Sequence, residues 1–191
     1  MYSYYILALI MLAYIAQLAI PGFTNTFIFR PELLFSEPWR AFTSMFLHDP
    51  QSLTHILFNG FSLLMFGPYL EQLIGSRRFI SLYIAAGIVG SLFFWATFAL
   101  GIIPAIPALG ASGAIFGILG ALAILRPNLT IYMWFFPMQM YQAAIAWVLL
   151  ELLGVFNPGS GIASAAHLGG LFLGLAYGYY VKGSGKHFVF R

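Results

Sequence analysis

Long apolar stretches constrain the fold of this chain more than any other feature. Of its 191 residues, 61% are hydrophobic and only 7% are charged, whereas a soluble domain carries about 25% charged residues. Because so few charges cannot cover a water-soluble globule of this length, lipid is the expected solvent for most of the chain. A helix that crosses the hydrocarbon core needs about 20 apolar residues. The apolar stretches predict six spans, at residues 4–20, 54–74, 79–100, 112–126, 138–155 and 162–181.

The expected fold is therefore all-α, a polytopic membrane bundle that forms a single domain over residues 1–191. The span at 112–126 is short, and an interfacial segment from Ile131 could lead into the next one. The connection over residues 22–53 is long, and such loops are usually functional or interfacial. The first span lacks a basic n-region, so we interpret it as a retained helix rather than a signal peptide.

The basic residues predict the orientation of the spans, because short cytoplasmic loops carry an excess of Lys and Arg. With six spans, six of the eight basic residues fall on one side: Arg77, Arg78, Arg126, Lys182, Lys186 and Arg191. Both termini are then cytoplasmic. The second, fourth and sixth spans begin on the outer side of a cell membrane.

Composition also excludes several function classes. The sequence has no cysteine, which excludes disulfides, zinc–thiolate sites and thiol catalysis. It also has no HExxH pair, the zinc-binding motif that would indicate a metalloprotease. The net charge of +3 comes mainly from residues at span ends and does not indicate nucleic-acid binding. We expect no cofactor and no metal.

A few polar groups inside the spans are candidates for chemistry, because such groups are costly in lipid. His55 opens the second span, Ser112 opens the fourth, and His167 lies early in the sixth. At 1.5 Å per residue, each lies within about 10 Å of the outer end of its span. A serine and two histidines from three helices are thus expected at similar depth.

Ser112 lies between glycines, in Gly110-Ala111-Ser112-Gly113, where backbone and substrate can approach closely. A serine at a helix N-terminus is also placed to stabilise developing negative charge, although Ser is equally a common N-cap. His167 is the matching base; a structural hydrogen bond between helices is the alternative for it.

Small residues at four-residue spacing predict close packing of the fourth and sixth spans. They are Gly113, Gly117 and Ala121 in one span, and Gly170, Gly174 and Gly178 in the other. Such pairing would bring Ser112 and His167 together, although small-residue faces often serve packing alone.

In the second span, His55 and Asn59 are four residues apart and point the same way. Both could donate hydrogen bonds to an oxyanion; an interfacial His and a satisfied buried Asn are the simpler interpretation. Glu71 lies about 24 Å farther along this helix, so a structural role is expected for it.

Among the carboxylates, Glu151 near the outer end of the fifth span and Asp49 just before the second could lie near the histidine. Neither belongs to a motif, and we therefore favour a Ser–His dyad without an acidic third member.

Together these residues resemble the rhomboid family over the stretch from Trp39 to Gly178. The resemblance rests on five motifs: Trp39-Arg40, His55-x-x-x-Asn59, Gly67-x-x-x-Glu71, Gly110-x-Ser112-Gly113, and Ala166-His167 followed by Gly170 and Gly174. It implies a hydrolase of the minimal six-span prokaryotic form, a serine endopeptidase that cleaves transmembrane or juxtamembrane segments. Its expected partners are transmembrane protein substrates and membrane lipid.

By this resemblance, Ser112 attacks the scissile carbonyl and His167 takes the proton. The backbone N–H of Ser112 and the side chains of Asn59 and His55 would form the oxyanion hole. Trp39 and Arg40 would be structural. Phe116 stands where the family often has Tyr, and it can still pack against His167. Residues 156–161 would belong to a cap over the site, with the fifth helix near a lateral gate.

Two other functions stay open at this stage. One is a non-proteolytic rhomboid-like protein that binds membrane clients, although such relatives typically lack the serine or the histidine. The other is a small transporter. Against the transporter, the sequence has no inverted repeat, and its polar residues cluster near one surface rather than at the midplane.

Overall fold

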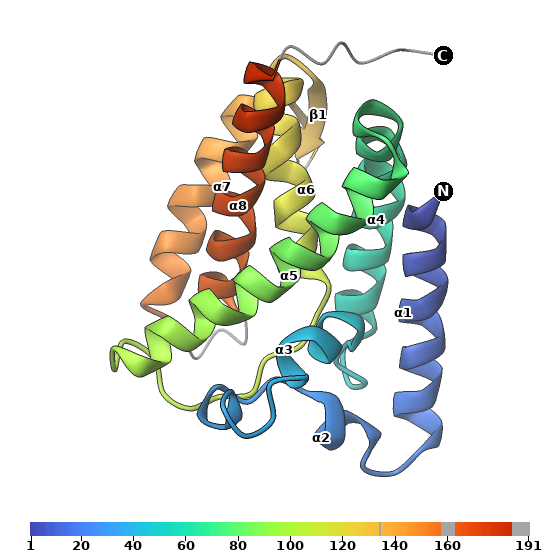
Figure 1. The fold of residues 1–191 in the computed structure, drawn as a ribbon, viewed down its shortest axis with the longest axis vertical. Coiled ribbons are helices and arrows are strands. Elements are labelled where there is room, and N and C mark those ends of the chain that lie inside the picture. Colours follow the sequence, from blue (N-terminus) through green and yellow to red (C-terminus); the bar gives the residue numbers. More distant parts are fainter. Residues whose placement is uncertain (134, 158–162, 185–191) are drawn as a thin grey trace.

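The computed structural model describes residues 1–133, 135–157 and 163–184, and it is mainly helical (Figure 1). The long helices coincide with the predicted apolar stretches within three residues at either end: α1 (Tyr2–Ala19), α4 (Leu53–Ile74), α5 (Ser76–Ala99), α6 (Ser112–Leu125), α7 (Met140–Val155) and α8 (Ser164–Gly183). Within the described ranges, α1, α4 and α5 are long and apolar enough to cross a membrane, while α6 and α7 are shorter apolar helices. Six crossings therefore stay a prediction.

Local sequence explains where these helices end. The connection from α4 to α5 is Gly75 alone, which has a φ of +85°, a conformation that side chains disfavour. At the end of α6, Arg126 leaves the helical region with φ −138° and ψ 59°. Pro127 follows directly, and a proline disfavours helical geometry in the residue before it.

Successive long helices run in alternating directions, so α4, α6 and α8 all begin at the lower end of the bundle in Figure 1. His55, Ser112 and His167 therefore lie toward one end. The basic residues at the start of α5, the end of α6 and the end of α8 lie toward the other: Arg77, Arg78, Arg126 and Lys182. Lys186 and Arg191 lie outside the described residues.

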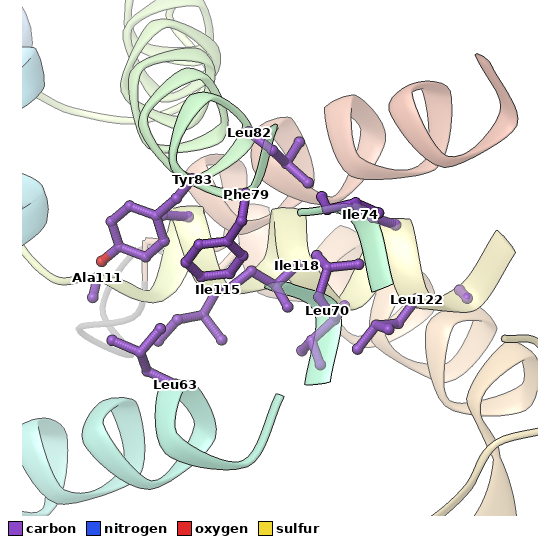
Figure 2. Packing of buried hydrophobic residues seen from close by; sticks show 14 of the residues in the cluster. Leu63, Leu70, Ile74, Phe79, Leu82, Tyr83, Ala111, Ile115, Ile118 and Leu122 are labelled. Carbon is purple, nitrogen blue, oxygen red and sulfur yellow. The ribbon is translucent and has the colours of Figure 1, made fainter. Parts of the chain in front are cut away.

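Helix α6 is the centre of the bundle. Most of its side chains are buried, and Ile115, Ile118 and Leu122 pack toward residues of α4 and α5 such as Leu70 and Phe79 (Figure 2). A helix surrounded by protein need not present a full apolar length to lipid, which accounts for its 14 residues.

The outer helices show the reverse pattern, with large apolar side chains on the surface. Leu12 and Leu18 on α1 are 64% and 61% exposed, and Leu150 and Leu153 on α7 are 59% and 71% exposed. Exposed apolar surface on this scale is what a bilayer covers.

The long connection after α1 is ordered by short helices and one buried arginine. It contains α2 (Phe23–Phe27), η1 (Pro31–Leu33), α3 (Arg40–Thr43) and η2 (Ser44–Phe46). Nη1 of Arg40 donates to the carbonyls of Asn25 (2.7 Å) and Ile28 (3.0 Å), and its Nε pairs with Glu37. Arg40 thus ties the connection together, whereas Trp39 is 49% exposed.

Two short strands precede α7, and they are not expected from the sequence. Strands β1 (Thr130–Met133) and β2 (Phe136–Gln139) pair antiparallel, with Thr130 opposite Gln139. Gln139 then caps α7 through a reciprocal capping box with Gln142, and the helix begins at Met140. Ile131, where an interfacial lead-in is expected, lies in β1.

At the end of the bundle away from Ser112, Glu71 caps α1. Its carboxylate accepts hydrogen bonds from the backbone of Tyr2 (2.7 Å) and Ser3 (2.9 Å), and from Ser3 Oγ (2.8 Å). An acceptor at a helix N-terminus satisfies otherwise free N–H groups and complements the helix dipole. This contact is structural in kind.

Candidate active site

The site is built where α6 and α8 touch backbone to backbone. A Cβ placed on Gly170 would lie 1.9 Å from the carbonyl oxygen of Gly113, and one on Gly174 would lie 2.1 Å from that of Gly117. No side chain fits in either gap. The predicted pairing of the two small-residue faces is thus present, and it sets the relative position of the two helix starts.

The pairing brings Ser112 and His167 into direct contact. Ser112 Oγ lies 2.7 Å from His167 Nε2, within hydrogen-bond distance. The ring of Phe116 stacks on the imidazole, with centroids 4.5 Å apart and planes at 6°. This is the contact between Phe116 and His167 that the sequence predicts. The stacked ring restricts rotation of the imidazole.

A carboxylate reaches the far side of the same imidazole. Glu151 Oε1, from α7, lies 2.9 Å from His167 Nδ1, and Glu151 also forms a side-chain hydrogen bond with Ser164 at the start of α8. Glu151 is one of two candidate carboxylates in the sequence, where the lack of a motif around it favours a dyad. The signal for including Glu151 was its charge inside an apolar span, which is costly without a partner.

His55 approaches Ser112 from α4. Its Nδ1 accepts the backbone N–H of Asp49 (3.3 Å), so in the neutral ring Nε2 carries the hydrogen. A Cβ on Gly110, whose φ is +129°, would lie 2.9 Å from His55 Nε2 and 3.5 Å from Ser112 Oγ. His55 Nε2 and Ser112 Oγ therefore flank the same small space, which only a glycine leaves open. Asp49 touches His55 through its backbone rather than its carboxylate.

Asn59 lies one turn farther along α4 and is 7% exposed. One N–H of its amide donates to the carbonyl of His55 at 2.9 Å. A primary amide has two N–H groups, so the second N–H of Asn59 does not take part in this hydrogen bond.

A small cavity adjoins the serine. Residues lining it include Ser112, Gly110, Met45, Phe94 and Ala166. The space open to the centres of water molecules is about 30 Å³, and one water needs about 10–15 Å³ on this measure. The cavity can therefore admit water beside Ser112 Oγ.

A second histidine, His48, lies behind His55, and no motif in the sequence marks it. Its side chain is fully buried, and its ring centroid is 5.0 Å from that of His55. Burial, together with the nearby charge of His55, lowers the pKa of His48 to about 3. His48 is thus a neutral packing partner of His55.

Within the described residues, no three His, Asp or Glu side chains gather in a way that could hold a metal ion. The site does contain a hydroxyl, an imidazole and a carboxylate that contact one another in series, with N–H donors nearby. That arrangement can activate a serine for attack on a carbonyl.

The sequence profile of the Rhomboid domain matches residues 36–184, which is most of the chain and includes every residue of the site. The chain belongs to the rhomboid family. Together with its apolar helices, this membership makes it a multi-pass membrane protein.

Several curated proteins are similar to this rhomboid chain. The putative rhomboid protease YdcA of Bacillus subtilis is 41% identical over 56 residues, 29% of this chain and 27% of YdcA. Rhomboid protein 1, mitochondrial, of Saccharomyces cerevisiae is 35% identical over 145 residues, 73% of this chain and 40% of the yeast protein. The inactive RHOMBOID-like protein 8 of Arabidopsis thaliana is 44% identical over 57 residues, 30% of this chain and 16% of the plant protein. Each match thus spans well under half of the relative.

Proposed function

We propose that this rhomboid is an intramembrane serine endopeptidase that cleaves transmembrane or juxtamembrane segments of other membrane proteins. The observation that carries the proposal is the 2.7 Å contact between Ser112 Oγ and His167 Nε2 at the N-terminus of α6. A serine that served only as an N-cap would direct its oxygen to its own helix backbone. Within the described residues α6 has no side-chain cap.

In the proposed reaction, Ser112 Oγ attacks the scissile carbonyl carbon while its proton passes to His167 Nε2. The tetrahedral intermediate collapses, and the same proton goes to the nitrogen of the leaving amine. A water then attacks the acyl-enzyme with His167 as base, which frees the new carboxyl end and returns the proton to Ser112.

The oxyanion would be stabilised by the backbone N–H of Ser112, the Nε2–H of His55 and the free N–H of Asn59. The glycine at 110 supports this role for His55, because it leaves open the space that His55 Nε2 and Ser112 Oγ share. The positive end of the α6 dipole adds to the same effect.

We further propose that residues 1–191 form one membrane domain with six crossings, in a cell membrane, with both termini cytoplasmic and the site open to the outer side. The common end of His55, Ser112 and His167 supports this orientation, as does the position of Arg77, Arg78 and other basic residues toward the opposite end. Residues 158–161 of the expected cap lie outside the described residues.

Covalent labelling of the detergent-purified protein by a fluorophosphonate probe tests the proposal, beside Ser112→Ala and His167→Ala. We expect the parent to label and both variants to stay unlabelled, with cleavage of a test transmembrane substrate following the same order. A folded parent that neither labels nor cleaves would favour a client-binding protein without protease activity. The experiment must distinguish these two outcomes, because one of the similar proteins is named as inactive.

A further inference from the structure

Granted the proposed function, we propose that Glu151 completes a Ser–His–Glu triad in which its carboxylate positions His167 and stabilises the imidazolium. Glu151 is a positioning residue, since it touches neither the substrate nor Ser112 but acts through the far nitrogen of the histidine. The three side chains come from three helices: α6 carries the serine, α8 the histidine and α7 the carboxylate.

The geometry assigns the tautomer of His167. An ionised carboxylate only accepts hydrogen bonds, so at 2.9 Å from Glu151 Oε1 the Nδ1 atom carries the hydrogen. In the neutral ring Nε2 is then bare and accepts the hydroxyl hydrogen of Ser112 across 2.7 Å. This is the tautomer that a general base next to the serine needs.

Glu151 is itself held in place. Its side chain is 13% exposed and that of His167 is 11% exposed, so little water screens the interaction between them. Ser164, three residues before His167 in the same helix, bonds the carboxylate as well. Two donors on one turn of α8 thus fix Glu151, which in turn fixes the plane of the imidazole against Phe116.

The proton balance of the triad needs no further group. When Ser112 Oγ bonds to the carbonyl carbon, its proton moves to His167 Nε2 and the ring becomes positive between the oxyanion and Glu151. Glu151 stays ionised throughout and takes no proton. The positive ring lasts until Nε2 delivers the proton to the leaving amine, and the carboxylate stabilises the charge over that interval.

A purely structural role for Glu151 is the competing explanation, since the same hydrogen bonds tie α7 to α8. The two roles differ in what loss of the charge changes. Loss of a tie lowers thermal stability and the amount of folded protein. Loss of a triad carboxylate lowers the rate constant of each folded molecule, and a variant that keeps the charge recovers part of it.

The test compares Glu151→Gln, which keeps the shape but not the charge, with Glu151→Asp, which keeps the charge on a shorter side chain. Glu71→Gln is the matched control, because it removes a buried carboxylate at the other end of the bundle. For each variant the pseudo-first-order rate constant of fluorophosphonate labelling is measured at one pH, beside the melting temperature in detergent. This rate constant does not depend on how much of the sample is folded.

We expect Glu151→Gln to label on the order of 10²–10⁴-fold more slowly than the parent. Glu151→Asp should recover part of the rate, and Glu71→Gln should change only the melting temperature. A Glu151→Gln variant with the parental rate constant would overturn the triad and leave a Ser–His protease standing. A folded parent inert to probe and substrate would instead remove the proposed function, and the triad with it.

Discussion

Replacing Gly170 by alanine tests whether the contact of α6 with α8 sets the active geometry. The new Cβ would lie 1.9 Å from the carbonyl oxygen of Gly113, whereas ordinary contact begins near 3.4 Å. Both groups are fixed to helix backbones, so no flexible side chain can give way. The helices must separate by about 1.5 Å at this point.

That separation acts on the catalytic pair, because Gly113 follows Ser112 and Gly170 lies three residues after His167. If the 2.7 Å distance between Oγ and Nε2 grows by about 1 Å, it exceeds the range of a hydrogen bond. A misplacement of this size costs about 100-fold in rate. Overpacking also costs about 1–3 kcal/mol of stability.

The assay is the rate constant of fluorophosphonate labelling, with thermal unfolding in detergent measured in parallel. Gly183→Ala is the matched control: it makes the same change on the same helix, where a Cβ meets nothing within 4 Å. We expect this control to match the parent in rate. If Gly170→Ala also labels at the parental rate, the reasoning from backbone contact to catalysis is wrong.

Three further changes probe the scaffold. Glu71→Ala leaves the donors at the start of α1 without their acceptor and should lower the free energy of unfolding by about 1–3 kcal/mol, measured by chemical denaturation in mixed micelles, with the labelling rate unchanged. Arg40→Ala leaves two carbonyls and the carboxylate of Glu37 without their donor and should lower the free energy of unfolding by a similar amount. Arg40→Lys lacks the planar guanidinium and should recover less than half of the fall in melting temperature. For His48, the lowered pKa means that between about pH 6.5 and pH 3 the imidazole is protonated in the unfolded chain but neutral in the folded protein. Stability should then fall by up to about 1.4 kcal/mol per pH unit down to about pH 3, and a His48→Phe variant that melts with the parent's acid sensitivity would contradict this.

The apolar stretches predict the positions of the long helices well, because helix formation in lipid depends on local composition and length. The breaks at Gly75 and Pro127 are local as well, and they fix helix ends within a few residues. The strands β1 and β2 escaped prediction because their aromatic, β-prone residues also suit a membrane interface, and only the pairing between the two strands distinguishes the two cases.

For the candidate site, sequence reasoning identified Ser112, His167, His55 and Asn59, since polar groups in apolar helices and glycines at four-residue spacing are visible along the chain. It did not identify His48, whose burial depends on how the connection after α1 folds back. Gln17 of α1 holds that segment through two hydrogen bonds with the backbone of His48, at 2.8 and 2.9 Å.

The sequence by itself thus determined a lipid solvent, the helical stretches, and a serine and histidine at matching depth. Only the tertiary structure decided that Glu151 contacts His167. Depth along a helix follows from counting residues, but which face α7 turns toward α8 depends on the packing of whole helices. Glu151 and Ser164 must meet across that interface before the carboxylate can reach Nδ1, and no spacing within either helix encodes such a contact.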